Sequence, residues 1–402
     1  MKKKKIILII AIVLIMIASL FTVNHFIVHK NMPNGVKIVL KNTDIDVFSD
    51  IKIKDLIEST NVKISNELDF LETSSIGKKE IKILYKYKGL KYVYTTVINV
   101  VDKELPIILS GTYKTVLVGK DHDFCKSAAY GDNFDRSPKC ELIGEYDINK
   151  VGTYKLTLKV TDNSKNVTEK TATLNVIKEF STNKPSDETP KVEFSDVVNT
   201  HKNESTEIGI DVSKWQGDSI DFNKVRDAGC SFVMLRLGVQ SGASKDISVD
   251  QYFEENYKKA TSSGLKVGVY VYSTAIKKET AIDHANWALK ELKDRELDLP
   301  IVYDWENWAY WNEYKMNFND INEIADSFIE TINKSKYKGM LYSSKYYLEI
   351  IWKNKNNYPV WLAHYTSNTS YKGDYDMWQL TNIGHIDGIK GDVDINIMYK
   401  NK

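Results

Sequence analysis

Eight short apolar runs recur between residue 207 and the C-terminus, and this recurrence restricts the fold more than any other feature of the chain. Amphipathic runs with helical spacing, such as residues 279–293 and 321–335, lie between several of them. Alternation of strands and helices is typical of a parallel sheet, and eight strands in about 195 residues predict a β/α barrel of the TIM type. Because only four or five helices are evident, we expect an irregular barrel whose last strands are joined by loops.

Four acidic side chains lie near the ends of these runs. Asp211 follows the first run, Asp304 and Glu306 close "IVYDWEN", and Asp394 lies in the last run, "DVDIN". Strand alternation places Asp304 and Glu306 on one face, with Trp305 on the other. Neighbouring ionised acids repel, and apolar surroundings increase the cost. Since functional side chains gather at one end of a β/α barrel, we expect the four acids to form one site.

Other interpretations of these acids are open. The Asp304–Glu306 pair is also compatible with an exposed, charged strand edge. Asp211 could instead cap a helix or turn through Ser213. Asp394 could be a structural hydrogen-bonding acid near the chain end. A metal site is not expected, because no histidine accompanies these acids in a ligand motif, and no cofactor is expected.

Aromatic residues near the ends of the runs are candidates for substrate binding, because aromatic rings stack on the apolar faces of sugars. Plain core packing is the competing interpretation for each. The candidates are Tyr272, Tyr342, Trp361, Tyr365 and Trp378.

Six motifs in this region occur in an order that resembles a known family. They are "IGIDVSKWQG", "VGVYVYS", "IVYDWEN", "VWLAHY", "MWQL" and "GDVDIN". From about Glu207 onward the chain resembles the glycoside hydrolase family 25 lysozymes, or Chalaropsis-type muramidases. It departs from the family's pattern in the bulky Trp305 and in the aromatic stretch that follows the acids.

The resemblance implies hydrolysis of the β-1,4 bond between N-acetylmuramic acid and N-acetylglucosamine in peptidoglycan. We assign Glu306 as the general acid/base, because its longer side chain reaches further into the cleft. Asp304 would stabilise positive charge at the reacting carbon or orient the substrate's 2-acetamido group, which in this family is thought to be the nucleophile. Asp211 and Asp394 would tune Glu306. The alternatives are a non-catalytic glycan-binding surface protein and a hydrolase of another N-acetylhexosamine polymer.

The N-terminus carries four lysines followed by an apolar run over residues 6–23. A helix of this length would span about 27 Å, close to the hydrocarbon core of a bilayer. Lysines before the run favour a cytoplasmic N-terminus. We therefore expect a single-pass cell-membrane protein with the bulk of the chain outside, or a secreted protein if the segment is a cleaved signal peptide.

Residues 31–178 alternate apolar and polar positions and contain a weak internal repeat, which predicts two all-β modules of about 75 residues. "IGKKEIKI" at 76–83 is similar to "VGTYKLTL" at 151–158. The second module resembles immunoglobulin-like bacterial surface modules. Cys125 and Cys140 form a possible disulfide in it, with two unpaired thiols as the alternative.

Residues 179–206 are polar and rich in Ser, Thr and Asn, which predicts a linker, with an extra edge strand near residues 191–198 as the alternative. The 55 Lys and Arg nearly balance the 54 Asp and Glu, so nucleic acid is not an expected partner. The expected partners are peptidoglycan strands and, through the N-terminal helix, the membrane. The predicted domains are an anchor (1–30), β-modules (31–104 and 105–178), a linker (179–206) and a catalytic barrel (207–402).

Overall fold

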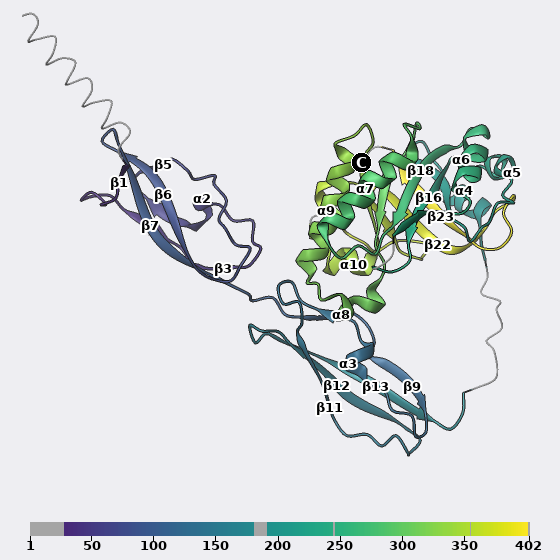
Figure 1. Ribbon diagram of the computed structural model, residues 1–402, viewed down its shortest axis with the longest axis horizontal. Helices are drawn as coiled ribbons and strands as arrows, with labels where there is room; N and C mark the ends of the chain where they lie inside the picture. The colour runs from purple at the N-terminus through teal and green to yellow at the C-terminus, as the bar shows by residue number, and fades with distance from the viewer. Residues whose placement is uncertain (1–27, 181–190, 244–245, 354, 401–402) are drawn as a thin grey trace, which may run out of the picture. The chain divides into compact units, whose positions relative to one another are not determined.

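The computed structural model describes residues 28–180, 191–243, 246–353 and 355–400. The chain divides into two compact units. The first runs to Leu105 and includes residues 163–166, whereas the second contains residues 106–162 and the chain from Val167 onward. Figure 1 traces both units by residue number.

The first unit contains one long antiparallel hairpin. Its strands β6 (Gly77–Tyr87) and β7 (Leu90–Val101) pair along their whole length. Side chains such as Ile83 and Ile98 are buried while their neighbours are not, so the hairpin has one core face. The smaller elements are β1 (Val28–His29), β2 (Ile38–Leu40), β3 (Asp44–Asp46), α2 (Ile53–Leu56), β4 (Ile57–Thr60) and β5 (Lys63–Ile64).

The second unit begins with a group of short and long strands, which we call the β-module and define as residues 106–162 and 167–177. Its four-stranded sheet has the order β11-β12-β13-β9, and β10 pairs with β8 separately. A disulfide joins Cys125 and Cys140 and closes a loop of 15 residues, which stabilises the fold by about 3 kcal/mol in a chain-entropy estimate. The elements are β8 (Ile107–Ile108), β9 (Tyr113–Leu117), α3 (Phe124–Ser127), β10 (Tyr130–Gly131), β11 (Lys139–Ile143), β12 (Gly152–Thr161) and β13 (Val167–Ile177).

The predicted immunoglobulin-like architecture is not supported by these sheets. An immunoglobulin-like sandwich packs two antiparallel sheets of about seven strands in total. In the β-module one sheet has four strands and the other has two, and β9 runs parallel to β13. Alternation of apolar residues predicted strands correctly but cannot distinguish between ways of pairing them.

The predicted membrane helix at residues 6–23 lies outside the described residues. Across the part of the chain that the structure does describe, no helix is both long enough and apolar enough to cross a membrane. This finding corrects the predicted fold class and localisation, both of which included a single-pass anchor.

The segment expected to be a linker is ordered in its second half. β14 (Val192–Glu193) pairs with β22 (Met377–His385) of the barrel, and α4 (Phe194–His201) follows directly. The side chains of Phe194 and Val197 are buried, because they lie three residues apart on the same helical face. Two buried apolar positions are sufficient to dock this short helix, although the composition around them is polar.

Eight strands of the second unit close into a barrel, as the eight apolar runs predicted. The order around the barrel is β15-β16-β18-β19-β20-β21-β22-β23, and β23 returns to pair with β15. The strands are β15 (Thr206–Val212), β16 (Phe232–Gln240), β18 (Lys266–Tyr272), β19 (Ile301–Asp304), β20 (Gly339–Ser344), β21 (Val360–Ala363), β22 (Met377–His385) and β23 (Val393–Tyr399), with β17 (Ile247–Val249) alongside β16.

The barrel departs from a regular eightfold β/α repeat at its last strands. β23 is antiparallel to both of its neighbours, and no helix lies between β21 and β22 or between β22 and β23 in the described residues. The prediction of a TIM-type barrel is therefore corrected to a closed, mixed barrel. Its helices are α5 (Phe222–Asp227), α6 (Phe253–Ser262), α7 (Lys278–Leu292), η1 (Trp308–Tyr310), α8 (Trp311–Tyr314), α9 (Phe318–Asn333), α10 (Lys345–Ile350) and η2 (Lys355–Asn357).

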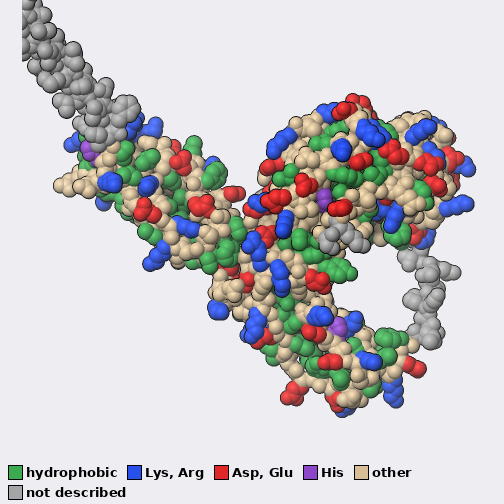
Figure 2. Space-filling view, in the orientation of Figure 1, with side chains coloured by type: hydrophobic (Ala, Val, Ile, Leu, Met, Phe, Trp, Pro, Cys, Tyr) green, Lys and Arg blue, Asp and Glu red, His purple; other side chains and the backbone are tan. Residues whose placement is uncertain are grey.

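Helices α7 and α9 pack side by side on the outside of the barrel (Figure 1). Helix α9 begins with a capping box, in which Asn317 and Asp320 each accept a hydrogen bond from the other's backbone N–H. Its buried residues, including Ile321, Phe328 and Ile332, follow the helical period. On the face shown in Figure 2, acidic and basic side chains are mixed over the barrel surface, in keeping with the nearly balanced charge.

Candidate active site

Alternation along the barrel strands separates an inner layer of side chains from an outer layer. Inner residues include Phe232, Met234, Val302 and Met340, which form one cluster inside the barrel. Outer residues such as Tyr303 pack against the helices. The inner layer fills the barrel up to one end, where polar side chains replace apolar ones and a pocket of about 270 Å³ opens.

All four predicted acids line this pocket, together with most of the predicted aromatic residues. Asp211 comes from β15, Asp304 from β19, Glu306 from two residues beyond it, and Asp394 from β23. Because β23 runs antiparallel to the other strands, its beginning lies at the end where they finish. Asp394 is paired directly with Asp211 across the two strands.

The predicted aromatic residues divide between the pocket and the outer layer. Tyr272, Tyr342, Trp361 and Tyr365 line the pocket. Trp378 does not: it lies in the outer core, and its indole Nε1 donates to the backbone oxygen of His364 at 2.8 Å. The physical reason is strand alternation, since the preceding residue, Met377, occupies the inner position.

Asp211 lies at the centre of a hydrogen-bond network that the sequence analysis did not predict. Its Oδ2 accepts from Gln379 Nε2 at 2.9 Å and from Asn396 Nδ2 at 2.8 Å. The Tyr342 hydroxyl donates to Gln379 Oε1 at 2.8 Å, and Trp361 Nε1 donates to Asn396 Oδ1 at 2.8 Å. Gln379 Oε1 also accepts from the Tyr365 hydroxyl at 3.2 Å. Each amide thus accepts hydrogen bonds at its oxygen and donates one from its nitrogen to the carboxylate, which favours the ionised form of Asp211.

The two amides in this network carried a weak sequence signal. Asn396 lies two residues after Asp394 and therefore on the same face of its strand, and Gln379 lies within the quoted motif "MWQL". Alternation alone would have placed Asn396 inward. Nothing in the sequence indicated that either side chain would contact Asp211.

Arg236 is the one arginine among the residues that line the pocket. Its guanidinium forms a buried ion pair with Asp250, at 2.6 Å from Nη2 to Oδ2 and 2.7 Å from Nε. Asp250 Oδ2 also accepts from the backbone N–H of Lys214. The positive charge of Arg236 partly offsets the factors that raise the pKa of Asp304.

Loss of hydration raises the pKa of every acid in the pocket, and for three of the four the charges of neighbouring acids raise it further. For Glu306, loss of hydration and then the charge of Asp211 raise the pKa to about 7, although its side chain is open to solvent within the pocket. Burial raises the pKa of Asp211 to about 6, against the effect of its two amide donors. For Asp394, burial and the charges of Asp211 and Glu306 raise the pKa to about 9. Burial and the charges of Glu306 and Asp211 raise the pKa of Asp304 well above its usual range.

Asp304 and Glu306 differ in exposure and in their partners. Asp304 is 5% exposed, and its Oδ1 accepts no hydrogen bond from any residue that the structure describes. Repulsion makes the second of two close acids harder to ionise, so such a pair shares a proton near neutral pH. Of the two side chains only Glu306 is open to solvent, so we assign the proton that a substrate can receive to Glu306.

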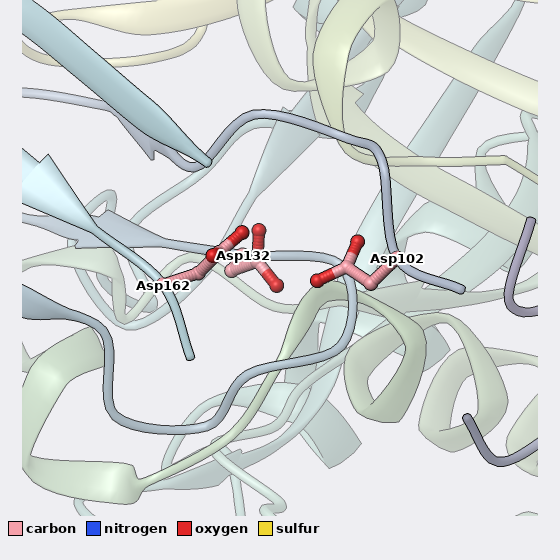
Figure 3. Close-up of side chains that lie close together, drawn as sticks. All are labelled: Asp102, Asp132 and Asp162. Carbon is pink, nitrogen blue, oxygen red and sulfur yellow. The ribbon is translucent and has the colours of Figure 1, made fainter. Parts of the chain in front are cut away.

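A second pair of acids lies outside the pocket, in the β-module. Carboxylate oxygens of Asp132 and Asp162, which are both buried, lie within 4.8 Å of each other (Figure 3). Asp132 Oδ1 accepts from the backbone N–H groups of Phe134 and Asp135 and so fixes the turn that follows it. Asp102, the third residue labelled in Figure 3, belongs to the first unit.

Comparison with known proteins finds a family and relatives that match the barrel region. Residues 210–389 match the model of the glycosyl hydrolases family 25. The uncharacterized protein YegX of Escherichia coli (strain K12) is 28% identical over 196 residues, which are 47% of this chain and 68% of that protein. The autolytic lysozyme of Clostridium acetobutylicum is 25% identical over 190 residues, which are 47% of this chain and 54% of that protein.

Two solved structures are also similar. A family 25 glycosyl hydrolase from Bacillus anthracis is 25% identical with a TM-score of 0.42, over 50% of this chain and 93% of that chain. The modular autolysin LytC from Streptococcus pneumoniae, solved with a synthetic peptidoglycan ligand, is 24% identical with a TM-score of 0.45. That match spans 60% of this chain and 56% of the LytC chain. On this family match, residues 210–389, which form most of the barrel, belong to the glycosyl hydrolases family 25 and are part of a glycoside hydrolase domain.

Proposed function

We propose that this chain is a muramidase that cleaves the β-1,4 bond between N-acetylmuramic acid and N-acetylglucosamine in peptidoglycan. The observation that carries the proposal is the solvent-open carboxyl of Glu306, whose pKa is raised to about 7 in a pocket shared with three other acids. Glycoside hydrolysis needs one acid that is protonated near neutral pH and a second acid that stabilises the oxocarbenium-like centre. Binding alone would not require such a costly cluster.

The roles follow from the environment of each acid. Glu306 would protonate the leaving oxygen, because it holds the shared proton at the open side of the pocket. Asp304 would stabilise positive charge at the reacting carbon or orient the 2-acetamido group, through the Oδ1 that accepts no hydrogen bond from the described residues. Asp211, held by its two amide donors, would keep the field at Glu306 negative, whereas its strand neighbour Asp394, whose pKa is raised to about 9, would be neutral near pH 7.

The products of the reaction test this proposal directly. The purified full-length chain is incubated with peptidoglycan, and the released fragments are reduced and identified by mass spectrometry. We expect N-acetylmuramic acid at the new reducing ends. Reducing-end N-acetylglucosamine, release of sugar from chitin oligomers alone, or binding without release of any fragment would each contradict the proposal.

The pH dependence of the hydrolysis rate should be bell-shaped and narrow. The rate falls as the pH rises through about 7, because Glu306 loses the proton that it donates. The rate also falls as the pH drops below about 6, because Asp211 becomes protonated and the site loses negative charge. Initial rates measured from pH 4 to 9 on a soluble glycan fragment would show both limbs, and a rate that keeps rising above pH 8 would be inconsistent with Glu306 as the acid.

Trp215 is a pocket residue that the sequence analysis did not select. Its side chain is 78% exposed, and Lys214 Nζ lies 5.0 Å from the centre of its ring. The backbone beneath it is fixed, because Lys214 N–H donates to Asp250 and Ser213 N–H donates to Gln216. An exposed indole on a fixed backbone at the rim of a pocket is suited to stacking on a sugar ring.

Replacing Trp215 by alanine should therefore raise KM by about tenfold, as expected for the loss of one aromatic contact, and leave kcat within about twofold. The measurement is steady-state hydrolysis of a soluble glycan fragment. The control is Tyr113→Ala, which removes an exposed aromatic ring in the β-module and should change neither constant. An unchanged KM in Trp215→Ala would exclude the stacking role.

A further inference from the structure

The segment that follows Glu306 is in direct contact with the β-module. Asn312 of α8 accepts a hydrogen bond from the backbone N–H of Tyr130 at 3.2 Å and donates to the backbone oxygen of Ala128 at 2.8 Å. Asn317 Nδ2 donates to the oxygen of Phe134 at 2.7 Å. We call residues 307–318 the post-acid segment. The β-module holds it through backbone groups, whose positions are set by the module's own fold.

A charged pair extends this contact to the start of α9. Arg136 Nε and Nη2 donate to the two carboxylate oxygens of Asp320, both at 2.7 Å. Asp320 is also the capping-box residue of α9, so the same carboxylate fixes the helix end and the module. Since Arg136 is 62% exposed, the pair adds little to stability. Its two parallel hydrogen bonds instead fix the geometry.

Gly131 of the β-module lies in tight contact with Trp311 and Phe318 of the post-acid segment. A Cβ atom at this position would lie 2.5 Å from Trp311 Nε1 and 2.9 Å from the ring of Phe318. The φ angle of Gly131 is outside the left-handed region, so its backbone would accept an L-residue. Packing alone therefore requires glycine here.

A series of aromatic contacts connects Gly131 with Trp305 and Glu306, which directly follow strand β19. Trp311 and Trp308 both contact the ring of Trp305, at centroid distances of 6.0 and 4.7 Å. Trp305 is fully buried, and its Nε1 donates to the backbone oxygen of Ala275 at 3.0 Å. The next residue is Glu306, whose backbone oxygen accepts from the N–H of Trp308 at 2.8 Å. A displacement of the post-acid segment would therefore move the backbone that carries Glu306.

We propose that the β-module is a positioning element of the active site. It holds the post-acid segment through Gly131 and the start of α9 through Arg136, and thereby fixes the position and the hydration of the Glu306 carboxyl. This proposal rests on the role proposed above for Glu306. It predicts that a change in the β-module, remote from the substrate, alters kcat and the protonation of Glu306 while substrate binding is retained.

The decisive comparison uses two glycine variants of the full-length chain in the same module. Gly131→Ala places a methyl group against Trp311 and Phe318, whereas Gly152→Ala places one 3.7 Å from Tyr154, at ordinary contact distance. We expect Gly131→Ala to lower kcat by about 10- to 100-fold, as small displacements of catalytic groups do, with KM within about twofold of wild type. The Gly152→Ala variant should match wild type in both constants.

Two further readouts separate positioning from a general loss of folding. In Gly131→Ala the alkaline limb of the pH–rate profile should move, because the hydration of Glu306 changes with its position. Arg136→Ala, a surface change that leaves the core intact, should shift kcat and the alkaline limb in the same directions by a smaller amount. Amide hydrogen exchange over residues 306–318 should increase in both variants and stay unchanged in Gly152→Ala.

The rate constants and the pH–rate profiles of these variants can each contradict the proposed role of the β-module. Wild-type kcat and an unmoved alkaline limb in both variants would overturn it, as would a loss of kcat in Gly131→Ala that is matched in Gly152→Ala. A wild-type chain that leaves peptidoglycan intact would instead overturn the proposed function, and the two failures are thereby distinguished. If the wild-type chain is inactive, unchanged amide hydrogen exchange over residues 306–318 in Gly131→Ala would still contradict the proposal that the β-module holds the post-acid segment.

Discussion

Replacing Glu306 by glutamine is expected to reduce the rate of peptidoglycan hydrolysis by about 10²- to 10⁴-fold, the usual contribution of a general acid. Glutamine has nearly the same shape as glutamate, so it preserves the pocket. Its amide cannot act as an acid, whereas the carboxyl of Glu306, with its pKa raised to about 7, can donate a proton near neutral pH. The loss should appear in kcat, with KM little changed, because the proton is needed only in the transition state. Reducing-end release from purified peptidoglycan measures the effect.

The matched control for this variant is Glu330→Gln, which makes the same chemical change on the exposed side of α9. It should retain wild-type rates. The alkaline limb of the pH–rate profile should also disappear in the Glu306 variant. Hydrolysis at more than about half the wild-type rate would show that another group donates the proton.

Replacing Asp304 by asparagine is expected to have two opposite effects, a loss of activity and a gain in stability. Activity should fall by about 10²-fold or more, because the carboxyl group that stabilises positive charge at the reacting carbon or orients the 2-acetamido group is removed. Stability should increase, because the folded state no longer confines Asp304 beside Glu306 and Asp211 in a buried pocket. Each kcal/mol gained would raise Tm by about 2–4 °C for a domain of this size.

The gain in stability should depend on pH in a definite direction. The pKa of Asp304 is raised in the folded state, so the folded protein binds more protons than the unfolded chain and loses stability as the pH rises above the ordinary value of about 3.9. The Asp304→Asn variant lacks this loss. The difference in Tm should therefore be small near pH 3.5 and grow toward pH 7.

Thermal unfolding followed by circular dichroism at several pH values provides the measurement. Asp283→Asn, a change on the exposed surface of α7, is the control and should leave Tm unchanged at every pH. A lower Tm for Asp304→Asn at pH 7 would mean that the carboxylate stabilises the fold, and the interpretation of the pocket as a strained functional site would be wrong.

Much of the barrel could be predicted because strand alternation is a local rule. A two-residue period places Asp304 and Glu306 on one face and Trp305 on the other, whatever the strand pairs with. The structure agrees, since Trp305 is buried in the outer core and both acids line the pocket. The same rule, applied to Trp378, would have excluded it from the pocket, because its neighbour Met377 is the inner residue.

Pairing between distant strands could not be predicted in the same way. The hydrogen bonds from Gln379 and Asn396 to Asp211 join residues 168 and 185 positions apart. The antiparallel direction of β23, which brings Asp394 beside Asp211, depends on how the barrel closes. The contact between the β-module and the post-acid segment joins residues more than 180 positions apart, such as Tyr130 and Asn312. No local pattern encodes such distances.

The sequence by itself determined which side chains face inward on each strand and that several acids would gather at one end of a barrel, because these properties follow from the geometry of single strands and from their order along the chain. Only the tertiary structure decided which acid accepts hydrogen bonds from two amides, which one is open to solvent, and which neighbouring module contacts the segment that follows it. Hydration, charge and packing at a given atom are set by all the groups around it, and in this fold those groups come from every part of the second unit.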